Sequence, residues 1–355
     1  MRFALLTPYG WSPDRDAPFD DTNDLTPARV IKHDRVGWTV VSCHGELRAD
    51  LRGALRGSSD IAERPGVGDW VSVSPRLYES GATIEAVLPR TSALVRNAAG
   101  RRTEAQVLAA NVDTVLICVP ADAAANPRRL ERELAMVWES GAEPVVVLTK
   151  SDLTADRAWV APLATRASVI AVDAMAADGM AALEPWRKPG STLVVIGPSG
   201  AGKSTLANRL LNEERLATGA VRDADWRGRH TTTWRELVVL PCGTLLIDTP
   251  GIREISLWDA SEGVSVAFDD VEDIAAGCRF NDCAHENEPG CEIQRALRNG
   301  SLDRERFANW KKLEAELAHQ ARRVDAQAAA AEKKRWAALT KAGRERGERK
   351  RSGGR

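Results

Sequence analysis

Residues 197–205 have the composition and spacing of a loop that binds nucleotide phosphates. Their sequence, Gly-Pro-Ser-Gly-Ala-Gly-Lys-Ser-Thr, matches the pattern G-x-x-x-x-G-K-[ST]. Glycines let successive backbone N–H groups curl around the phosphates, and a helix that starts here adds its partial positive charge. We expect Lys203 to reach the β- and γ-phosphates as a catalytic group, and the Ser204 hydroxyl to ligate Mg²⁺. The predicted phosphate contacts are Gly197, Pro198, Ser199, Gly200, Ala201, Gly202, Lys203, Ser204 and Thr205.

A second motif, Asp248-Thr249-Pro250-Gly251, follows the phosphate loop in the sequence. Taken alone it would be ordinary turn sequence, because proline and glycine occur in loops everywhere. After a phosphate loop, an aspartate at the end of a strand holds Mg²⁺ through water, which we predict for Asp248. The backbone N–H of Gly251 is then placed to donate to the γ-phosphate. Between the two motifs lies a run of three threonines, of which we predict Thr232 as a Mg²⁺ ligand when a triphosphate is bound.

A third motif, residues 149–152, reads Thr-Lys-Ser-Asp. The Asp152 carboxylate can accept hydrogen bonds from N1–H and the exocyclic amine of guanine, which adenine cannot supply. The usual first residue is Asn, and in isolation such a motif is more often a surface loop. Further on, Asp173 and Ala174 stand where a Ser-Ala pair usually supports the base, with Asp173 in place of the serine. The predicted guanine contacts are Thr149, Lys150, Ser151, Asp152, Asp173 and Ala174.

The order of these motifs along the chain is itself informative. In ordinary GTPases the phosphate loop comes first and the guanine motif comes near the end. Here the guanine motif at 149–152 precedes the phosphate loop at 197–205, and the Asp-Thr-Pro-Gly motif follows both. This order predicts a circularly permuted GTPase.

Cysteine and histidine gather between residues 278 and 291 with the spacing C-x4-C-x-H-x5-C. Three thiolates and one imidazole make a closed tetrahedral Zn²⁺ site of the structural kind. The alternative is a set of disulfides or loose thiols. The sequence has no recognisable signal peptide, and in a reducing cytoplasm clustered cysteines bind metal more often than they pair. We therefore predict one structural zinc ion per chain, held by Cys278, Cys283, His285 and Cys291.

Apolar runs precede the nucleotide motifs, as expected of buried strands that position them. These runs alternate with helical stretches, which is the βαβ rhythm of a doubly wound parallel sheet. A helix is also predicted directly after the phosphate loop, from Thr205 to Leu211. The predicted strands are residues 114–119, 143–148, 168–172, 192–196 and 243–247.

The first part of the chain has a different pattern. Between residues 31 and 92 short alternating segments are separated by glycine turns, which predicts a small β-barrel. Its loops and flanks are rich in arginine, and such a rim suits RNA phosphates. The alternative is a solvated β-domain that only packs on the GTPase domain. The arginines are Arg48, Arg52, Arg56, Arg64, Arg90, Arg96, Arg101 and Arg102.

The 355 residues are enough for two or three domains, and the net charge of −1 confines any nucleic-acid affinity to local patches. The fold class that we predict is an α/β P-loop GTPase domain, circularly permuted, preceded by an OB-like β-barrel and followed by a zinc-binding, mainly helical module. We expect a cytoplasmic monomer without membrane association. The predicted divisions are an irregular extension at 1–30, the barrel at 31–92, the GTPase domain at 105–275, the zinc module at 276–325, and a basic, disordered tail at 326–355.

The combination of barrel, permuted motifs and cysteine cluster resembles the ribosome small-subunit-dependent GTPase A family (RsgA/YjeQ). The resemblance covers about residues 30–325 and includes four further phrases. It implies a GTPase that binds the small ribosomal subunit and its rRNA, acts late in the maturation of that particle, and is stimulated by it. The phrases are Arg64–Val71, Leu88–Ser92, Gly228–Thr233 and Glu288–Cys291.

The residue that would orient the attacking water is missing from its usual position. Ras-like enzymes use a glutamine directly after the Asp-x-x-Gly motif, but here Ile252 stands there. His230 resembles the switch histidine of the family and could supply the missing group as a second catalytic residue; the alternative is an exposed loop histidine. Two other functions stay open: a GTP-regulated RNA-binding switch in which hydrolysis only times release, and a P-loop ATPase or kinase with a zinc module.

Overall fold

The computed structural model describes residues 3–13, 19, 24–34, 36–56, 60–76, 81–97, 105–121, 127–150, 167–176, 178–213, 235–248, 261–280, 282–286 and 288–318. The chain divides into two compact units. Unit 1 is Met1–Leu257 with Glu262–Asp269, and unit 2 is Trp258–Ser261 with Asp270–Arg355. Within the described ranges, no helix is both long and apolar enough to cross a membrane.

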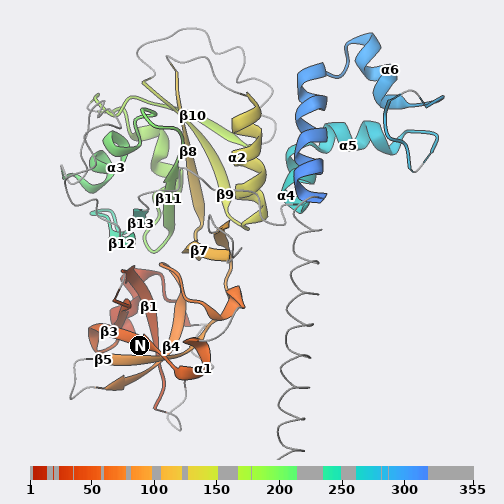
Figure 1. The fold of residues 1–355 in the computed structure, drawn as a ribbon. Coiled ribbons are helices and arrows are strands. Elements are labelled where there is room, and N and C mark those ends of the chain that lie inside the picture. Colours follow the sequence, from red (N-terminus) through yellow and green to blue (C-terminus); the bar gives the residue numbers. More distant parts are fainter. Residues whose placement is uncertain are drawn as a thin grey trace, which may run out of the picture. The chain divides into compact units, whose positions relative to one another are not determined.

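A parallel sheet forms the centre of unit 1 (Figure 1). Its strands run in the order β10-β9-β8-β11-β13, and each neighbouring pair is parallel, as expected for buried apolar strands. Strand β12 (Arg235–Val239) adds antiparallel to β13. The predicted α/β fold is thus confirmed. The parallel strands are β8 (Thr114–Pro120), β9 (Glu143–Thr149), β10 (Ser168–Val172), β11 (Thr192–Ile196) and β13 (Leu245–Asp248).

Successive residues of a strand point to opposite faces of the sheet, so these continuously apolar strands make both faces apolar. Helices cover both faces. Leu116 and Cys118 of β8 pack in the same core as Leu206 of α3 (Lys203–Leu211). The neighbouring Ile117 packs with Leu130 of α2 (Pro127–Glu139) in the other core. Figure 1 shows α2 and α3 on opposite sides of the sheet. Shorter helical segments are η6 (Ala181–Trp186) and α4 (Ser261–Ala267).

A closed five-stranded barrel precedes the sheet. Its strands pair in the order β1-β2-β3-β5-β4, and β4 pairs back with β1. Alternate residues such as Val30, Val71 and Ile84 fill the interior. Strand β1 begins at Thr26, inside the segment 1–30 that the sequence assigns to the N-terminal extension. Its residues Ala28 and Val30 belong to the barrel core. The strands are β1 (Thr26–His33), β2 (Trp38–Ser42), β3 (Gly45–Leu51), β4 (Trp70–Arg76) and β5 (Gly81–Val87), with α1 (Gly53–Arg56) and η3 (Ile61–Glu63) between them.

The described part of the N-terminal segment packs onto the barrel. It forms η1 (Ala4–Tyr9), and Trp11 lies edge-on to Trp70 of the barrel at 4.7 Å. The ring centres of Phe3 and Phe19 lie 6.0 and 5.9 Å from that of Trp11. The sequence predicts that the N-terminal segment is irregular, but the burial of these four aromatic rings together stabilises its packing on the barrel. A hairpin, β6 (Ala93–Asn97) with β7 (Ala105–Ala110), joins barrel and sheet along the chain.

One buried arginine links the barrel to the parallel sheet. Arg29 of β1 is 2% exposed and donates to the Gly68 carbonyl, the Asn111 carbonyl and the Thr192 hydroxyl, the last at 2.8 Å. It also donates to the Tyr9 carbonyl. Strand β1 continues the sheet through β12 as well, with Lys32 opposite Glu236. The barrel is therefore joined to the parallel sheet by both backbone pairing and a buried cation.

Arg29→Ala is expected to destabilise unit 1 by more than about 3 kcal/mol, because it leaves several buried acceptors unpaired and opens a cavity. Urea denaturation followed by tryptophan fluorescence measures this change. The exposed Arg56→Ala is the matched control on the barrel and should stay within about 0.5 kcal/mol of the parent. Equal stabilities for the two variants would contradict the linking role of Arg29.

Unit 2 is helical. It contains α5 (Asp269–Ala276), α6 (Glu292–Asn299) and the helical residues 304–318. Arg306 holds the helix at 304–318 to α5 through a forked ion pair with Asp270, at 2.6 and 2.8 Å. The buried side chains of Phe307 and Trp310 belong to the core of unit 2. The prediction of a mainly helical module after the GTPase domain is confirmed.

Candidate nucleotide and metal sites

The predicted nucleotide motifs meet at one edge of the parallel sheet. The guanine motif begins at Thr149, where β9 ends, and Asp173 follows β10. The phosphate loop follows β11, and Asp248 is the last residue of β13. Since these strands are parallel neighbours, their carboxyl ends lie side by side, which is where open α/β sheets bind ligands.

The phosphate loop adopts a conformation that only glycine permits at its first position. Gly197 has φ +135°, and a Cβ there would lie 2.4 Å from the Cys118 carbonyl oxygen of β8. At the other end, Gly202 has φ +76° and caps the N-terminus of α3. The Lys203 ammonium donates to the Pro198 carbonyl at 2.6 Å, so the lysine folds back across its own loop. The loop thus has the closed turn and helix N-terminus that a phosphate group needs.

Thr149 connects the guanine motif to the phosphate loop. Its hydroxyl donates to the Ala201 carbonyl at 2.9 Å, and the side chain is buried. The following residue, Lys150, has φ +54°, so the chain turns sharply where the motif leaves β9. The Thr149 hydroxyl therefore has a structural role, because it fixes the spacing between two segments that are predicted to bind the nucleotide.

The loop after β10 is held by its own aspartate. The Asp173 carboxylate accepts from the Met175 N–H at 2.9 Å, and the Asp173 carbonyl accepts from the Ala176 N–H at 3.2 Å. Arg209 of α3 donates to the Ala176 carbonyl at 3.3 Å. Asp173 thus shapes the turn that presents the backbone of Ala174, as a serine would do through its hydroxyl.

Several predicted site residues lie outside the described residues. These include the base-reading carboxylate and the switch residues, and only the backbone of Asp248 is described. Their roles remain predictions. The residues concerned are Ser151, Asp152, His230, Thr232 and Gly251.

The cysteine and histidine side chains of unit 2 converge on one point. The four ligand atoms all lie within 4.8 Å of one another. The Nδ1 atom of His285 is 3.6 Å from the sulfurs of both Cys278 and Cys291, and these sulfurs are 3.9 Å apart. With Zn–S of about 2.3 Å and Zn–N of about 2.1 Å, a tetrahedron gives about 3.6 Å for S···N and about 3.8 Å for S···S. The cluster can hold a metal ion, and its spacing fits zinc. None of the six cysteines forms a disulfide in the structure, which argues against the disulfide alternative.

Local structure favours the metal-binding forms of Cys278 and His285, whereas burial raises the pKa of Cys283 to about 11. Burial acts to raise the pKa of Cys278, but the backbone N–H groups of Ile293 and Glu292 at the start of α6 lower it overall. Burial, together with nearby Lys311, lowers the pKa of His285. A thiolate and a neutral imidazole are the forms that ligate zinc. Gln294 also donates to the His285 carbonyl at 2.6 Å and fixes the loop that carries the histidine.

Purified protein is expected to contain about one zinc ion per chain, and Cys283→Ser should lose it. Because ligands and local fold form together, chelation should unfold unit 2 while unit 1 keeps its structure. Elemental analysis with far-UV circular dichroism checks both points, with Cys43→Ser of the barrel as the control. Full zinc content in the Cys283→Ser protein would contradict this ligand set.

The structure corrects one expectation about the arginine-rich rim of the barrel. Arg90 is 13% exposed and forms a two-pronged ion pair with buried Asp69, at 2.8 Å for both contacts. It therefore stabilises the turn before β4 and is not available to RNA. Arg48 and Arg52 remain 47% and 63% exposed, although they contact Asp34 and Glu85.

Known proteins share this sequence and fold. Residues 87–258 match the family model described as RsgA GTPase. The "Small ribosomal subunit biogenesis GTPase RsgA" of Opitutus terrae is 47% identical over 333 residues, covering 90% of each chain. That of Streptomyces avermitilis is 43% identical over 340 residues, covering 93% of this chain and 90% of the relative.

Solved structures agree with the fold. YjeQ from Thermotoga maritima matches with a TM-score of 0.59 and 26% identity, covering 83% of this chain and 99% of that chain. YloQ, described as a circularly permuted GTPase, matches with the same TM-score and 20% identity, covering 83% and 96%. The predicted circular permutation is confirmed.

Proposed function

Since the chain belongs to the RsgA GTPase family, we propose that it hydrolyses GTP in the biogenesis of the small ribosomal subunit. The observation that best supports the proposal is a hydrogen bond between two motifs. The Thr149 hydroxyl of the guanine motif donates to the Ala201 carbonyl of the phosphate loop. A guanine base and a triphosphate bound at this edge would occupy neighbouring segments of one rigid site.

The residues of the phosphate loop supply most of the chemistry. The loop amides and Lys203 stabilise negative charge on the β- and γ-phosphates as the terminal bond breaks. To do so, the Lys203 ammonium gives up its hydrogen bond to the Pro198 carbonyl and donates to a phosphate oxygen instead. Ser204 and Asp248, with Thr232 in the triphosphate state, would hold Mg²⁺, which neutralises phosphate charge when bound.

The small subunit would complete the active site. Ile252 has an aliphatic side chain that cannot orient water, so hydrolysis by the protein alone should be slow. His230 is the candidate for the missing group. Its imidazole can exchange a proton near neutral pH.

The barrel is the candidate docking surface for rRNA. Arg48 and Arg52 are exposed, and the surface ion pairs that they make contribute little, so rRNA phosphates can replace Asp34 and Glu85 as their partners. The metal in unit 2 would be a structural zinc, since four protein ligands leave no open coordination position. We further propose that the protein acts as a cytoplasmic monomer.

Nucleotide preference tests the proposed GTPase against a P-loop ATPase or kinase. Titration with fluorescent GDP and ADP analogues should show at least about a hundredfold preference for guanine, because the Asp152 carboxylate would be left unpaired by adenine. Asp152→Asn should remove most of this preference, with Asp178→Asn as a charge-matched control beyond the guanine-supporting loop. Equal binding of both nucleotides by the parent protein would reject the proposal.

A further inference from the structure

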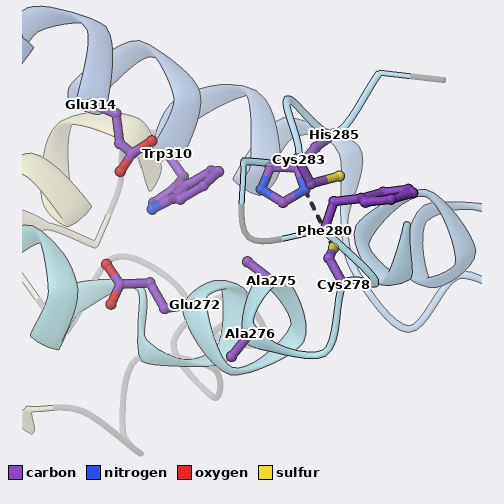
Figure 2. A pocket seen from close by; sticks show the side chains of 9 residues that line it. All are labelled: Glu272, Ala275, Ala276, Cys278, Phe280, Cys283, His285, Trp310 and Glu314. Atoms are coloured by element: carbon purple, nitrogen blue, oxygen red, sulfur yellow. Dashed lines mark hydrogen bonds between the residues drawn. The ribbon is translucent and has the colours of Figure 1, made fainter. Parts of the chain in front are cut away.

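A cavity of about 350 Å³ lies within unit 2, beside the metal cluster. It opens between α5 and the helical residues 304–318, which the Arg306–Asp270 ion pair holds together. Figure 2 shows the cluster at one end and two glutamates at the other. The lining residues are Glu272, Ala275, Ala276, Cys278, Phe280, Cys283, His285, Trp310 and Glu314.

The cavity is acidic. Of the nine described residues that line it, two are glutamates and none is lysine or arginine. Glu272 comes from α5 and Glu314 from the helix at 304–318, and partial burial together with the charge of Glu272 raises the pKa of Glu314. A zinc ion with three thiolates and a neutral imidazole would add a further charge of −1. The lining itself thus favours a cationic ligand, although Arg279 lies over the Phe280 ring and Lys311 lies near His285.

An aromatic wall at this cavity carries a polar group without a partner. Trp310 is 6% exposed, and its Nε1 atom has no hydrogen-bond partner among the described residues. Figure 2 shows this nitrogen on the side of the ring toward Glu272 and Glu314. The ring is fixed by stacking on Phe307 at 5.8 Å and lies 5.8 Å from the His285 ring. A buried N–H without an acceptor costs about 1–3 kcal/mol, so an acceptor that approached here would be bound favourably.

Exposed aromatic surface continues the wall outward. Phe280 lines the cavity and is 43% exposed, and the Arg279 guanidinium lies over its ring at 5.6 Å. Two carboxylates on separate helices together with aromatic faces match the guanidinium group. This group is planar, carries five donors in a fork that fits carboxylates, and stacks on aromatic rings.

We propose that this cavity binds an arginine side chain of a partner protein. The guanidinium lies between Glu272 and Glu314, its stem packs along the aromatic wall, and a backbone carbonyl of the bound segment accepts from the Trp310 indole N–H. Unit 2 thus presents a protein-binding surface, in contrast to the RNA-binding surface proposed for the barrel. The site does not depend on GTP hydrolysis.

Titration of the full chain, with bound zinc, by N-acetyl-arginine N-methylamide tests this site. The readout is the indole N–H resonance of Trp310 in tryptophan-labelled protein, assigned by its absence in Trp310→Phe. We expect a saturable shift of this resonance. In the double variant Glu272→Gln and Glu314→Gln, the affinity for the arginine probe should fall at least about tenfold. Asp273→Asn, the exposed neighbour on α5, is the charge-matched control and should bind like the parent.

The neutral isostere N-acetyl-citrulline N-methylamide separates charge recognition from shape, and it should produce no saturable shift. Zinc content of each variant shows that unit 2 is intact. The proposal is overturned if the arginine probe leaves the Trp310 resonance unchanged, if the double variant binds as tightly as the parent, or if citrulline binds equally well. A saturable shift with a short RNA oligonucleotide and none with the arginine probe would instead assign this surface to RNA.

Discussion

Lys203→Ala is expected to lower the rate of GTP hydrolysis by at least about a hundredfold at saturating nucleotide and small subunits. The Lys203 ammonium folds onto the Pro198 carbonyl in the structure and so already lies at the loop that would surround the phosphates. Removal of its charge leaves the developing negative charge on the γ-phosphate without its mobile counter-charge. A methyl group cannot replace that interaction.

Release of phosphate measured in single turnovers checks this expectation. Lys188→Ala removes an equal charge from an exposed position before β11 and should keep the parental rate. Circular dichroism of both proteins excludes unfolding as the cause. Parental turnover in the Lys203→Ala protein would show that residues 197–205 are not the catalytic phosphate loop.

Gly197→Ala is expected to weaken GDP binding at least about thirtyfold. The new methyl group would lie 2.4 Å from the Cys118 carbonyl oxygen, which is backbone and cannot swing away. In addition, φ +135° is strained for any residue with a Cβ. Each effect costs about 1–3 kcal/mol, and the loop can relieve both only by leaving its phosphate-binding conformation.

Gly200→Ala is the matched control within the same loop. Gly200 also has positive φ, +79°, but a Cβ there meets no atom within 4 Å. Its affinity for GDP should therefore fall much less than that of Gly197→Ala, by about tenfold at most. Equal losses in the two variants would mean that the close approach to β8 does not determine the loop conformation.

The nucleotide motifs and the metal cluster could be predicted from the sequence because each has a short, fixed spacing. Gly197, Gly202 and Lys203 lie within seven positions, and backbone geometry alone nearly determines their arrangement. The same is true of the cysteines between residues 278 and 291, whose ligand atoms converge as the spacing predicts.

The remaining features depend on contacts between distant parts of the chain. Thr149 is only a variant of asparagine in the sequence, and its role appears once Ala201 lies beside it, 52 positions away. Arg90 is one of several arginines in a basic segment, and only the buried Asp69 removes it from the surface. No local pattern contains these pairings, since tertiary packing decides them.

Stimulation of GTP hydrolysis by purified small ribosomal subunits tests the central claim most directly. Basal turnover should be slow, because Ile252 cannot orient water, and mature small subunits should raise it at least about tenfold. Large subunits at the same concentration serve as the control and should have no effect. A rise of less than about twofold with small subunits, well under 1 kcal/mol of barrier, would contradict a GTPase that acts on this particle.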